Sequence, residues 1–326
     1  MPARKNRDPS STTVARIPKR LMGEWQQLLR AAFFARWGSP YRRTDFFQDY
    51  VNHDPNYRLG SILGLYTDGR LVSTCQTFSR QLVIRGSIFK LDGLGNIATQ
   101  PAEQGRGHGK ALLRWFLGHK KPQSDLVMLF SSQGTIYKKL GWKSAVSCEY
   151  VVRKPILQSL FSQTKEVTVR LMQMHDLTAI GHLYSIFNRA EALTHLVRSP
   201  KYWKNWIYSF KLRVYGLQSW MVTARGKPIG YVFMRTKNGR MEIDEYAAGP
   251  AHYEQVFQAF LLIFRSSRAQ LLTFKRTSPQ LQKFFLRYSV QFEEVTISDG
   301  TSYTLILNPA LRVHESNLGL WHVDHF

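Results

Sequence analysis

Hydrophobic positions at the start of the chain follow a helical period and then a strand-like one. From Leu21 to Phe33 apolar side chains recur every three or four residues, and Pro40 lies beyond the last of them, which predicts a helix. Three strand-like segments with short turns between them come next: 59–66, 71–84 and 87–99. Short turns of this kind predict an antiparallel meander, which ends before Pro101.

The following segments alternate between helix and strand. A glycine-rich loop leads into a largely apolar helical stretch at residues 109–118, and a short apolar strand is predicted at 126–130. A short helix at 135–140 ends at Gly141, and another strand is predicted at 145–152. The first half therefore has the order helix, three strands, helix, strand, helix, strand.

From Val167 the chain repeats this order with unrelated side chains. Strands are predicted at seven places: 167–172, 220–224, 228–235, 241–246, 270–274, 292–297 and 303–307. Helices are predicted at four places: 176–187, 200–210, 251–265 and 279–288. An internal duplication with a period of about 155 residues is the simplest explanation.

The repeat predicts an α+β protein of two tandem domains, each with a mixed, mostly antiparallel sheet between layers of helices in an α/β/α arrangement. A length of 326 residues agrees with two domains. The predicted boundaries are a basic flexible tail at 1–20, a first domain at 21–152, a linker at 153–166 and a second domain at 167–326.

Charge is the unusual feature of the composition. The formal net charge is +23, and residues 1–160 carry 25 basic and 10 acidic groups against 20 and 12 in the rest. Such a field attracts polyanions, which include nucleic acid, anionic membrane surfaces and phosphate-bearing cofactors. A solvated basic surface without a partner is the simpler alternative.

The cysteines and the apolar runs indicate the compartment. Cys75 and Cys148 lie in apolar strand-like stretches without a CxxC motif, which predicts buried thiols rather than disulfides. No run approaches the roughly 18 to 20 apolar residues of a membrane span, and the N-terminus lacks the order of a secretory signal. We therefore expect a cytoplasmic protein without a membrane span.

The loop Gln104-Gly105-Arg106-Gly107-His108-Gly109-Lys110 is the strongest chemical signal. Its glycines expose successive backbone N–H groups at the start of a helix, where the helix dipole also favours an anion. A glycine-rich loop by itself also fits an ordinary tight turn. Lys110 is followed by Ala111, so the GxxxxGK[ST] order of a P-loop is absent, and the preceding strand belongs to a meander rather than a βαβ unit.

Gln104-x-x-Gly107-x-Gly109, placed after this meander, resembles the Gln/Arg-x-x-Gly-x-Gly/Ala motif of the GCN5-related N-acetyltransferases (GNAT). The resemblance covers the whole first domain and includes Ile136-Tyr137-Lys138-Lys139-Leu140-Gly141-Trp142, which is similar to the tyrosine-bearing segment of that family. The chain departs from the family before this segment, where Ser131-Ser132-Gln133 stands in place of a frequent Asn.

The resemblance implies acetyl-CoA as co-substrate. The strand Ile97-Ala98-Thr99 would separate from its neighbour and pair with the pantetheine arm through backbone groups, chiefly those of Ile97 and Thr99. The pyrophosphate would lie on the amides of Arg106 to Lys110, and a backbone N–H near Thr99 would hold the oxyanion.

Acetyl transfer to an amine also needs proton transfer. A lysine-like amine has a pKa of about 10.4, so a base, acting directly or through water, must take its proton. The departing thiolate needs an acid, and the resemblance implies Tyr137 for this role. The simpler interpretation of Tyr137 is a core aromatic residue hydrogen-bonded at its edge.

The tandem arrangement resembles the enhanced intracellular survival (Eis) branch, in which only the first domain binds coenzyme A. The second copy agrees, since its helix at 251–265 follows Ala247-Ala248-Gly249-Pro250 without any Q/RxxGxG motif. In Eis proteins the terminal carboxylate takes part as base, which makes Phe326 a candidate here, although this chain lacks their third domain. The tail 320–326 also fits an edge strand.

Other carboxylates are candidates for contact with a cationic acceptor. Asp244 and Glu245 lie on a second-domain strand, and three more follow the first helix: Asp45, Asp49 and Asp54. The simpler interpretation of all five is a solvated surface. His322, Asp324 and His325 suggest a metal site, but there is no second ligand cluster and no HExxH, so we expect no metal.

Two functions follow from these patterns. The favoured one is an N-acetyltransferase acting by direct transfer on a primary amine of a small molecule, a peptide or a protein lysine. The alternative is a non-catalytic GNAT-fold protein whose basic surface binds nucleic acid or the ribosome. Trp203, Trp206 and Tyr208 among nearby lysines fit a helix with an apolar face better than a nucleic-acid surface. The sequence specifies neither the acceptor nor the oligomeric state.

Overall fold

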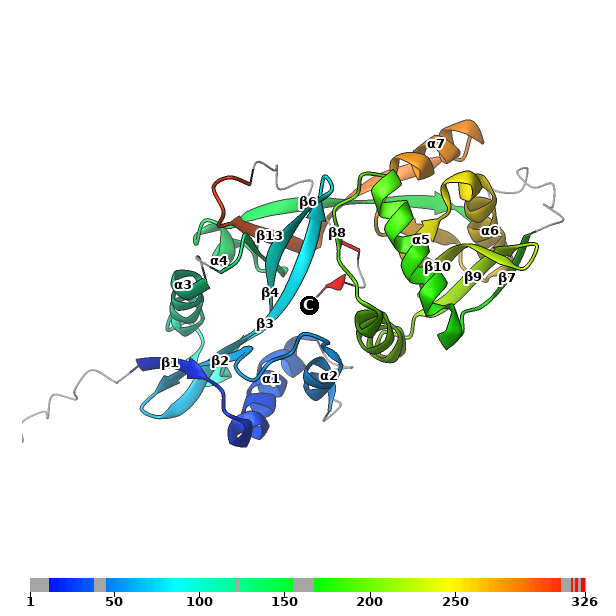
Figure 1. Cartoon of the computed structure of the whole chain (residues 1–326). Coiled ribbons are helices and arrows are strands. Elements are labelled where there is room, and N and C mark those ends of the chain that lie inside the picture. The colour runs from blue at the N-terminus through cyan, green and yellow to red at the C-terminus, as the bar shows by residue number, and fades with distance from the viewer. Residues whose placement is uncertain are drawn as a thin grey trace, which may run out of the picture.

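One continuous sheet runs through both halves of the protein in the computed structural model (Figure 1). The structure describes residues 12–37, 45–120, 123–154 and 167–311, together with positions 318, 320, 321, 324 and 325. The strand order is β1-β2-β3-β4-β5-β13-β6-β12-β11-β10-β9-β7, with β8 paired to β3.

The first half contains the predicted meander and the helices that cover it. Its strands are β1 (Thr12–Arg16), β2 (Ile62–Thr67), β3 (Arg70–Ile84), β4 (Ser87–Thr99), β5 (Leu126–Phe130) and β6 (Lys143–Arg153). Its helices are η1 (Lys19–Leu21), α1 (Met22–Trp37), α2 (Phe46–His53), η2 (Pro101–Glu103), α3 (His108–Lys120) and α4 (Gly134–Lys138).

Side-chain alternation along β5 shows how the layers form. Leu126 and Met128 join the hydrophobic core that includes residues of α1 and α2, whereas Val127 and Leu129 join the core that includes residues of α3 and α4. Successive strand residues point to opposite faces of a sheet. Both faces of the first half are therefore covered, which gives the α/β/α layers that the sequence predicts.

Residues 12–20 differ from the predicted flexible tail. Thr12–Arg16 form the edge strand β1, which pairs antiparallel with β2, and the next residue, Ile17, is buried. The side chains of β1 are largely exposed, so the segment carries no hydrophobic period in the sequence. Backbone pairing orders it instead, and residues 1–11 lie outside the described part.

The second half repeats the same plan. Its strands are β7 (Val167–Leu171), β8 (His195–Leu196), β9 (Gln218–Ala224), β10 (Lys227–Lys237), β11 (Arg240–Ala248), β12 (Leu271–Phe274) and β13 (Phe292–Ile306). Its helices are η4 (Met174–Asp176), α5 (Leu177–Ala190), the π-helix η5 (Tyr202–Leu212), η6 (Pro250–His252), α6 (Tyr253–Ser266) and α7 (Pro279–Arg287).

The duplication is visible in the pairing of the strands. In the first half β4 pairs in parallel with β5 after the crossover through α3. In the second half β11 pairs in parallel with β12 after the crossover through α6. The fold thus contains the same α+β plan twice in tandem, as predicted.

The two halves exchange their last strands. β13, from the end of the second half, pairs with β5 of the first half, and β6, from the end of the first half, pairs with β12 of the second. β6 and β13 also pair with each other along most of their length. The domain boundaries at residues 152 and 167 stay a prediction. In the folded protein, each half of the sheet contains a strand that comes from the other half of the sequence.

Tyr303 of β13 contacts the first half at a point where only glycine fits. A Cβ added to Gly134, the first residue of α4, would lie 2.1 Å from Oη of Tyr303 and 3.1 Å from its Cζ. The Tyr303 ring also lies beside the ring of Tyr137, with 5.4 Å between centroids.

We predict that Gly134→Ala lowers the free energy of unfolding by about 1–3 kcal/mol, because the added methyl group overpacks this contact. The same substitution in a Tyr303→Phe background should cost less, since the nearest atom is removed. Urea unfolding of the four proteins measures both costs. Equal costs in the two backgrounds would show that β13 does not lie against α4.

Candidate active site

The strands β4 and β5 separate at one end, and this separation defines the candidate site. They pair only where Leu91–Leu94 lie beside Leu126–Leu129, while β4 continues to Thr99. The pairing of β3 with β4 shifts between Thr74 and Gln76, and Asn96 opposite this shift has a φ of 50°. The bulge bends β4 away from β5, because an extra residue in one strand locally kinks it.

The backbone beyond the bulge has donors and acceptors on its β5 side. Gln100 donates its N–H to the carbonyl of Val72 on β3, over 2.9 Å. In an antiparallel ladder alternate residues point their groups to opposite sides, so Thr99 and Ile97 point theirs away from β3. Ala98 faces β3, and its carbonyl accepts a hydrogen bond from Oγ of Ser73 at 2.8 Å.

The glycines of the loop have distinct reasons for being glycine. Gly105 and Gly107 have φ values of 80° and 86°, a conformation that other L-residues adopt only with strain, and no atom lies within 4 Å of a Cβ added there. A Cβ on Gly109 would lie 3.4 Å from Oγ1 of Thr99. Two glycines therefore shape an open turn, and the third faces the end of β4.

Helix α3 begins directly after this turn. Its first helical hydrogen bond runs from the N–H of Ala111 to the carbonyl of Gly107, at 2.9 Å. The amides of His108, Gly109 and Lys110 precede it and have no acceptor within the helix. Together with the positive end of the helix dipole, these amides form a site suited to phosphate oxygens.

The side chains of the loop are less free than the sequence suggests. The carboxylate of Glu103 lies 3.1 Å from Nη1 of Arg106 and 3.3 Å from Nε2 of His108. Gln104 donates from Nε2 to the carbonyl of Thr99 at 3.3 Å. Glu103 thus holds the two basic side chains at the rim, and the backbone amides are the main anion donors.

Tyr137 lies on α4, on the same side of the sheet as α3. It is buried beside Trp142 and Tyr303. Burial raises the pKa of its hydroxyl, and a hydrogen bond with Ser131 lowers the pKa by a smaller amount. The hydroxyl therefore stays protonated at neutral pH and is able to donate. Ser131 is the first residue after β5, so it lies at the separated end of the strands.

The two cysteines differ in exposure. Cys75 is fully buried as predicted, and burial raises the pKa of its thiol to about 12, so it is not a thiolate at neutral pH. Cys148 is only partly buried, contrary to the prediction for it, because it lies on the β6–β13 pair, where Glu294 raises its pKa by hydrogen bonding. Both cysteines are free thiols.

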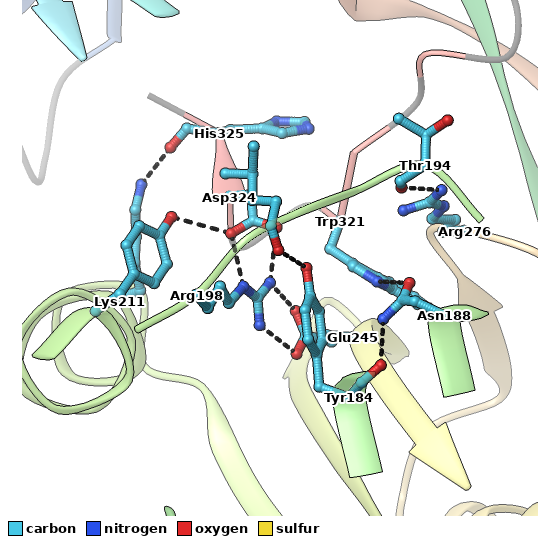
Figure 2. A network of polar contacts seen from close by, with 12 residues as sticks. Tyr184, Asn188, Thr194, Arg198, Lys211, Glu245, Arg276, Trp321, Asp324 and His325 are labelled. Carbon is cyan, nitrogen blue, oxygen red and sulfur yellow. Dashed lines mark hydrogen bonds and ion pairs between the residues drawn. The ribbon is translucent and has the colours of Figure 1, made fainter. Parts of the chain in front are cut away.

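A buried network of charges joins the second half to the tail of the chain (Figure 2). Nε and Nη2 of Arg198 lie 3.0 and 2.7 Å from the carboxylate oxygens of Asp324, and Nη1 and Nη2 also bind Glu245. Hydroxyl groups of Tyr202 and Tyr231 donate to Asp324 and Glu245, at 3.0 and 2.6 Å. Burial opposes the charge of Arg198, but the two carboxylates outweigh it and raise its pKa well above the ordinary value.

Four of the five candidate carboxylates are buried rather than solvated, which corrects the sequence interpretation. Glu245 binds Arg198, and Asp54 lies 2.9 Å from Nη1 of Arg80 with both side chains buried. Asp49 and Asp244 are also buried, whereas Asp45 is exposed. Residues from distant segments satisfy these charges, so the local sequence gives no sign of their burial.

The lysine-rich segment 201–211 does not present a basic aromatic surface. Trp203, Trp206 and Lys211 are buried, and Nζ of Lys211 donates to the carbonyl of His325 at 2.6 Å. Burial lowers the pKa of Lys211 to about 7. These side chains hold the protein together, so the segment gives no support to the nucleic-acid alternative.

The tail of the chain lies beside the candidate site. The ring of His325 stacks on Phe130, the last residue of β5, with 3.6 Å between centroids. Phe326 and His322 lie outside the described residues, so the role predicted for Phe326 stays a prediction. In the described part of the chain no group of three or more His, Cys, Asp or Glu residues is placed to hold a metal.

The structure thus brings together the end of β4, the loop with the start of α3, and Tyr137. The sequence did not indicate a role for Arg198 or Tyr303, nor the ion pair between Arg198 and Asp324. No local motif marks them, because each acts through a contact with a segment more than a hundred residues away. The described residues also include no helix long and apolar enough to cross a bilayer.

Comparison with known proteins supports this geometry. Residues 14–145 match the family model of the acetyltransferase (GNAT) domain, whereas no curated protein matches the sequence. A GCN5-related N-acetyltransferase from Anabaena variabilis ATCC 29413 has a similar structure, with a TM-score of 0.69 at 17% identity over 91% of this chain and 73% of that one.

Two further structures agree over both halves. A probable N-acyltransferase from Enterococcus faecalis V583 gives a TM-score of 0.70 at 17% identity, covering 91% of this chain and 73% of that one. Eis1 from Mycobacterium abscessus gives 0.64 at 17% identity, covering 91% and 74%. Residues 14–145 therefore match the acetyltransferase (GNAT) domain family, and the chain as a whole has a tandem fold similar to that of Eis1.

Proposed function

We propose that the chain transfers an acetyl group from acetyl-CoA directly to a primary amine, at the separated ends of β4 and β5. The observation that carries this proposal is the open glycine turn at Gly105 and Gly107, followed directly by the free amides of α3. Acetyl-CoA supplies the activated thioester when bound. The residues of the chain supply binding, orientation and proton transfer.

The pyrophosphate is bound by the amides of Arg106 to Lys110. Gly105 and Gly107 carry no side chain, and nothing lies within 4 Å of a Cβ added at either position. Phosphate oxygens therefore have open access to the backbone there. The backbone groups of Ile97 and Thr99 that face away from β3 would pair with the pantetheine arm. This pairing takes the place of the missing strand contact with β5.

Tyr137 is the general acid for the departing sulfur. Its raised pKa keeps the hydroxyl protonated at neutral pH, so that a proton is available to the departing sulfur. The fully buried, protonated thiol of Cys75 is not available as a nucleophile, which favours direct transfer over a covalent acyl-enzyme. The acceptor is an amine of a small molecule, a peptide or a protein lysine.

We expect Gly107→Ala to weaken acetyl-CoA binding by about 5- to 30-fold. Alanine pays about 1–2 kcal/mol in the left-handed conformation of this turn, so the unliganded loop relaxes and must be restored on binding. Calorimetry with acetyl-CoA measures the change. Gly118→Ala is the matched control, because Gly118 lies at an exposed and unstrained position of α3, the helix that follows the turn. This variant should bind acetyl-CoA like the wild type.

Loss of binding in both glycine variants would indicate a general effect on α3, and unchanged binding in both would argue against a phosphate site in the turn. Absence of any thermal stabilisation of the wild type by acetyl-CoA would reject the proposed function itself.

We predict that Tyr137→Phe lowers kcat by about a hundredfold, because general acid catalysis contributes roughly that much, while acetyl-CoA affinity stays unchanged. Thiol release with a panel of amines measures turnover. Tyr303→Phe removes a hydroxyl from the neighbouring ring and should retain most of its turnover. Unaltered turnover in Tyr137→Phe would exclude it as the acid.

A further inference from the structure

The segment after β8 holds the tail of the chain at three points. Arg198 binds the carboxylate of Asp324 with two nitrogens, and the hydroxyl of Tyr202 donates to Oδ1 of Asp324 at 3.0 Å. Lys211, nine residues further along on η5, donates to the carbonyl of His325 at 2.6 Å. Figure 2 shows Arg198 and Lys211 in contact with two adjacent tail residues, Asp324 and His325.

Burial makes the contact between Arg198 and Asp324 strong and specific. The side chains of Arg198, Asp324 and Glu245 have no exposed surface. A planar guanidinium with two carboxylates in bidentate contact fixes the angle between them, which a lysine cannot do. Removing one partner leaves a buried charge uncompensated, so the tail has no other position of similar energy beside Arg198.

Trp321 provides a second anchor for the tail. It is fully buried, its Nε1 donates to Oδ1 of Asn188 at 2.9 Å, and Arg276 lies over its ring. The ring also packs on Tyr246 of β11, with 5.1 Å between centroids. The tail is thus fixed on the second half before it reaches the first.

The held tail reaches the candidate active site at His325. The ring of His325 stacks on Phe130 at an interplanar angle of 18°, and the next residue, Ser131, is hydrogen-bonded to Tyr137. The contacts therefore run without a gap from Glu245 and Arg198 through Asp324 and His325 to the segment that carries Tyr137. Displacement of the tail removes the ring that packs on the end of β5.

We propose that Arg198 and Asp324 are positioning residues for acetyl transfer, forming a clamp that holds residues 324–325 against β5 and so orders the segment 130–137. The second half thereby contributes to a site whose phosphate and proton-transfer groups lie in the first. This role rests on the proposed function, in which Tyr137 must lie beside the departing sulfur. Arg198 and Asp324 themselves touch no reacting atom.

Asp324→Asn tests the clamp, because it keeps the shape of the side chain and removes the charge that Arg198 needs. We expect kcat to fall at least tenfold, with acetyl-CoA affinity within about twofold of the wild type, since the glycine turn is untouched. Turnover is measured with the amine of the panel that the wild type acetylates fastest. Hydrogen exchange of residues 126–142 should become faster.

Asp176→Asn is the matched control. Asp176 binds Arg170 with two hydrogen bonds of 2.6 and 2.7 Å, so the same change breaks a similar pair that does not contact the tail. It should lower stability but leave kcat and the exchange of residues 126–142 unchanged. An equal loss of kcat in the control, or no loss in Asp324→Asn, would overturn the clamp.

Lys211→Met is the second variant, for the case that Asp324→Asn fails to fold. It removes the hydrogen bond to His325 together with the ammonium group over the neighbouring aromatic rings, and an apolar side chain of similar length keeps the packing. Slower turnover with acetyl-CoA binding kept supports the clamp, and wild-type turnover contradicts it. A wild type that binds no acetyl-CoA and acetylates no amine instead rejects the proposed function.

Discussion

The exchange of β6 and β13 between the two halves is the constraint on which the rest of the structure depends. β13 fills the place beside β5, so the first sheet is incomplete without residues more than 150 positions away. The exchanged strand also brings Tyr303 against Tyr137. Neither half is therefore a closed unit, and the candidate site is assembled from the whole chain.

This assembly buries charged side chains, and their removal from water costs free energy. The charged side chains of five residues lie in the interior: Arg198, Asp324, Glu245, Asp54 and Arg80. Replacement of such groups by apolar side chains often leaves stability equal or greater, so their worth lies in the arrangement that they select. A guanidinium shared by two carboxylates defines one position of the tail, which a purely apolar contact would leave less well defined.

The sequence predicted the parts that depend on local pattern. The meander, the glycine turn and the tyrosine segment lie close to their predicted positions, because turns, strand alternation and the motif are each contained within some twenty residues. The segments 292–297 and 303–307 were correctly placed as strands but form one long β13, whose pairing shifts between Ile297 and Ser302.

The rest could not be predicted because it depends on partners far away in the chain. Glu245 and Asp54 look like surface carboxylates until Arg198 and Arg80 are placed beside them. The strand β1 is fixed by its neighbour β2 and not by its own side chains. A single sequence shows which residues are polar, but it does not show which of them meet.

The second half has no glycine loop, and its separated strands contact Arg198 and Trp321 instead. β11 pairs with β12 only over Arg240–Ile243 and continues to Ala248, just as β4 continues past β5. Beyond that pairing Glu245 binds Arg198 and Tyr246 packs on Trp321, while Arg276, just after β12, lies over the Trp321 ring. The position that corresponds to the end of β4 and the glycine turn thus contacts the tail of the chain itself. The open strand end of the second half is therefore occupied by Arg198 and Trp321.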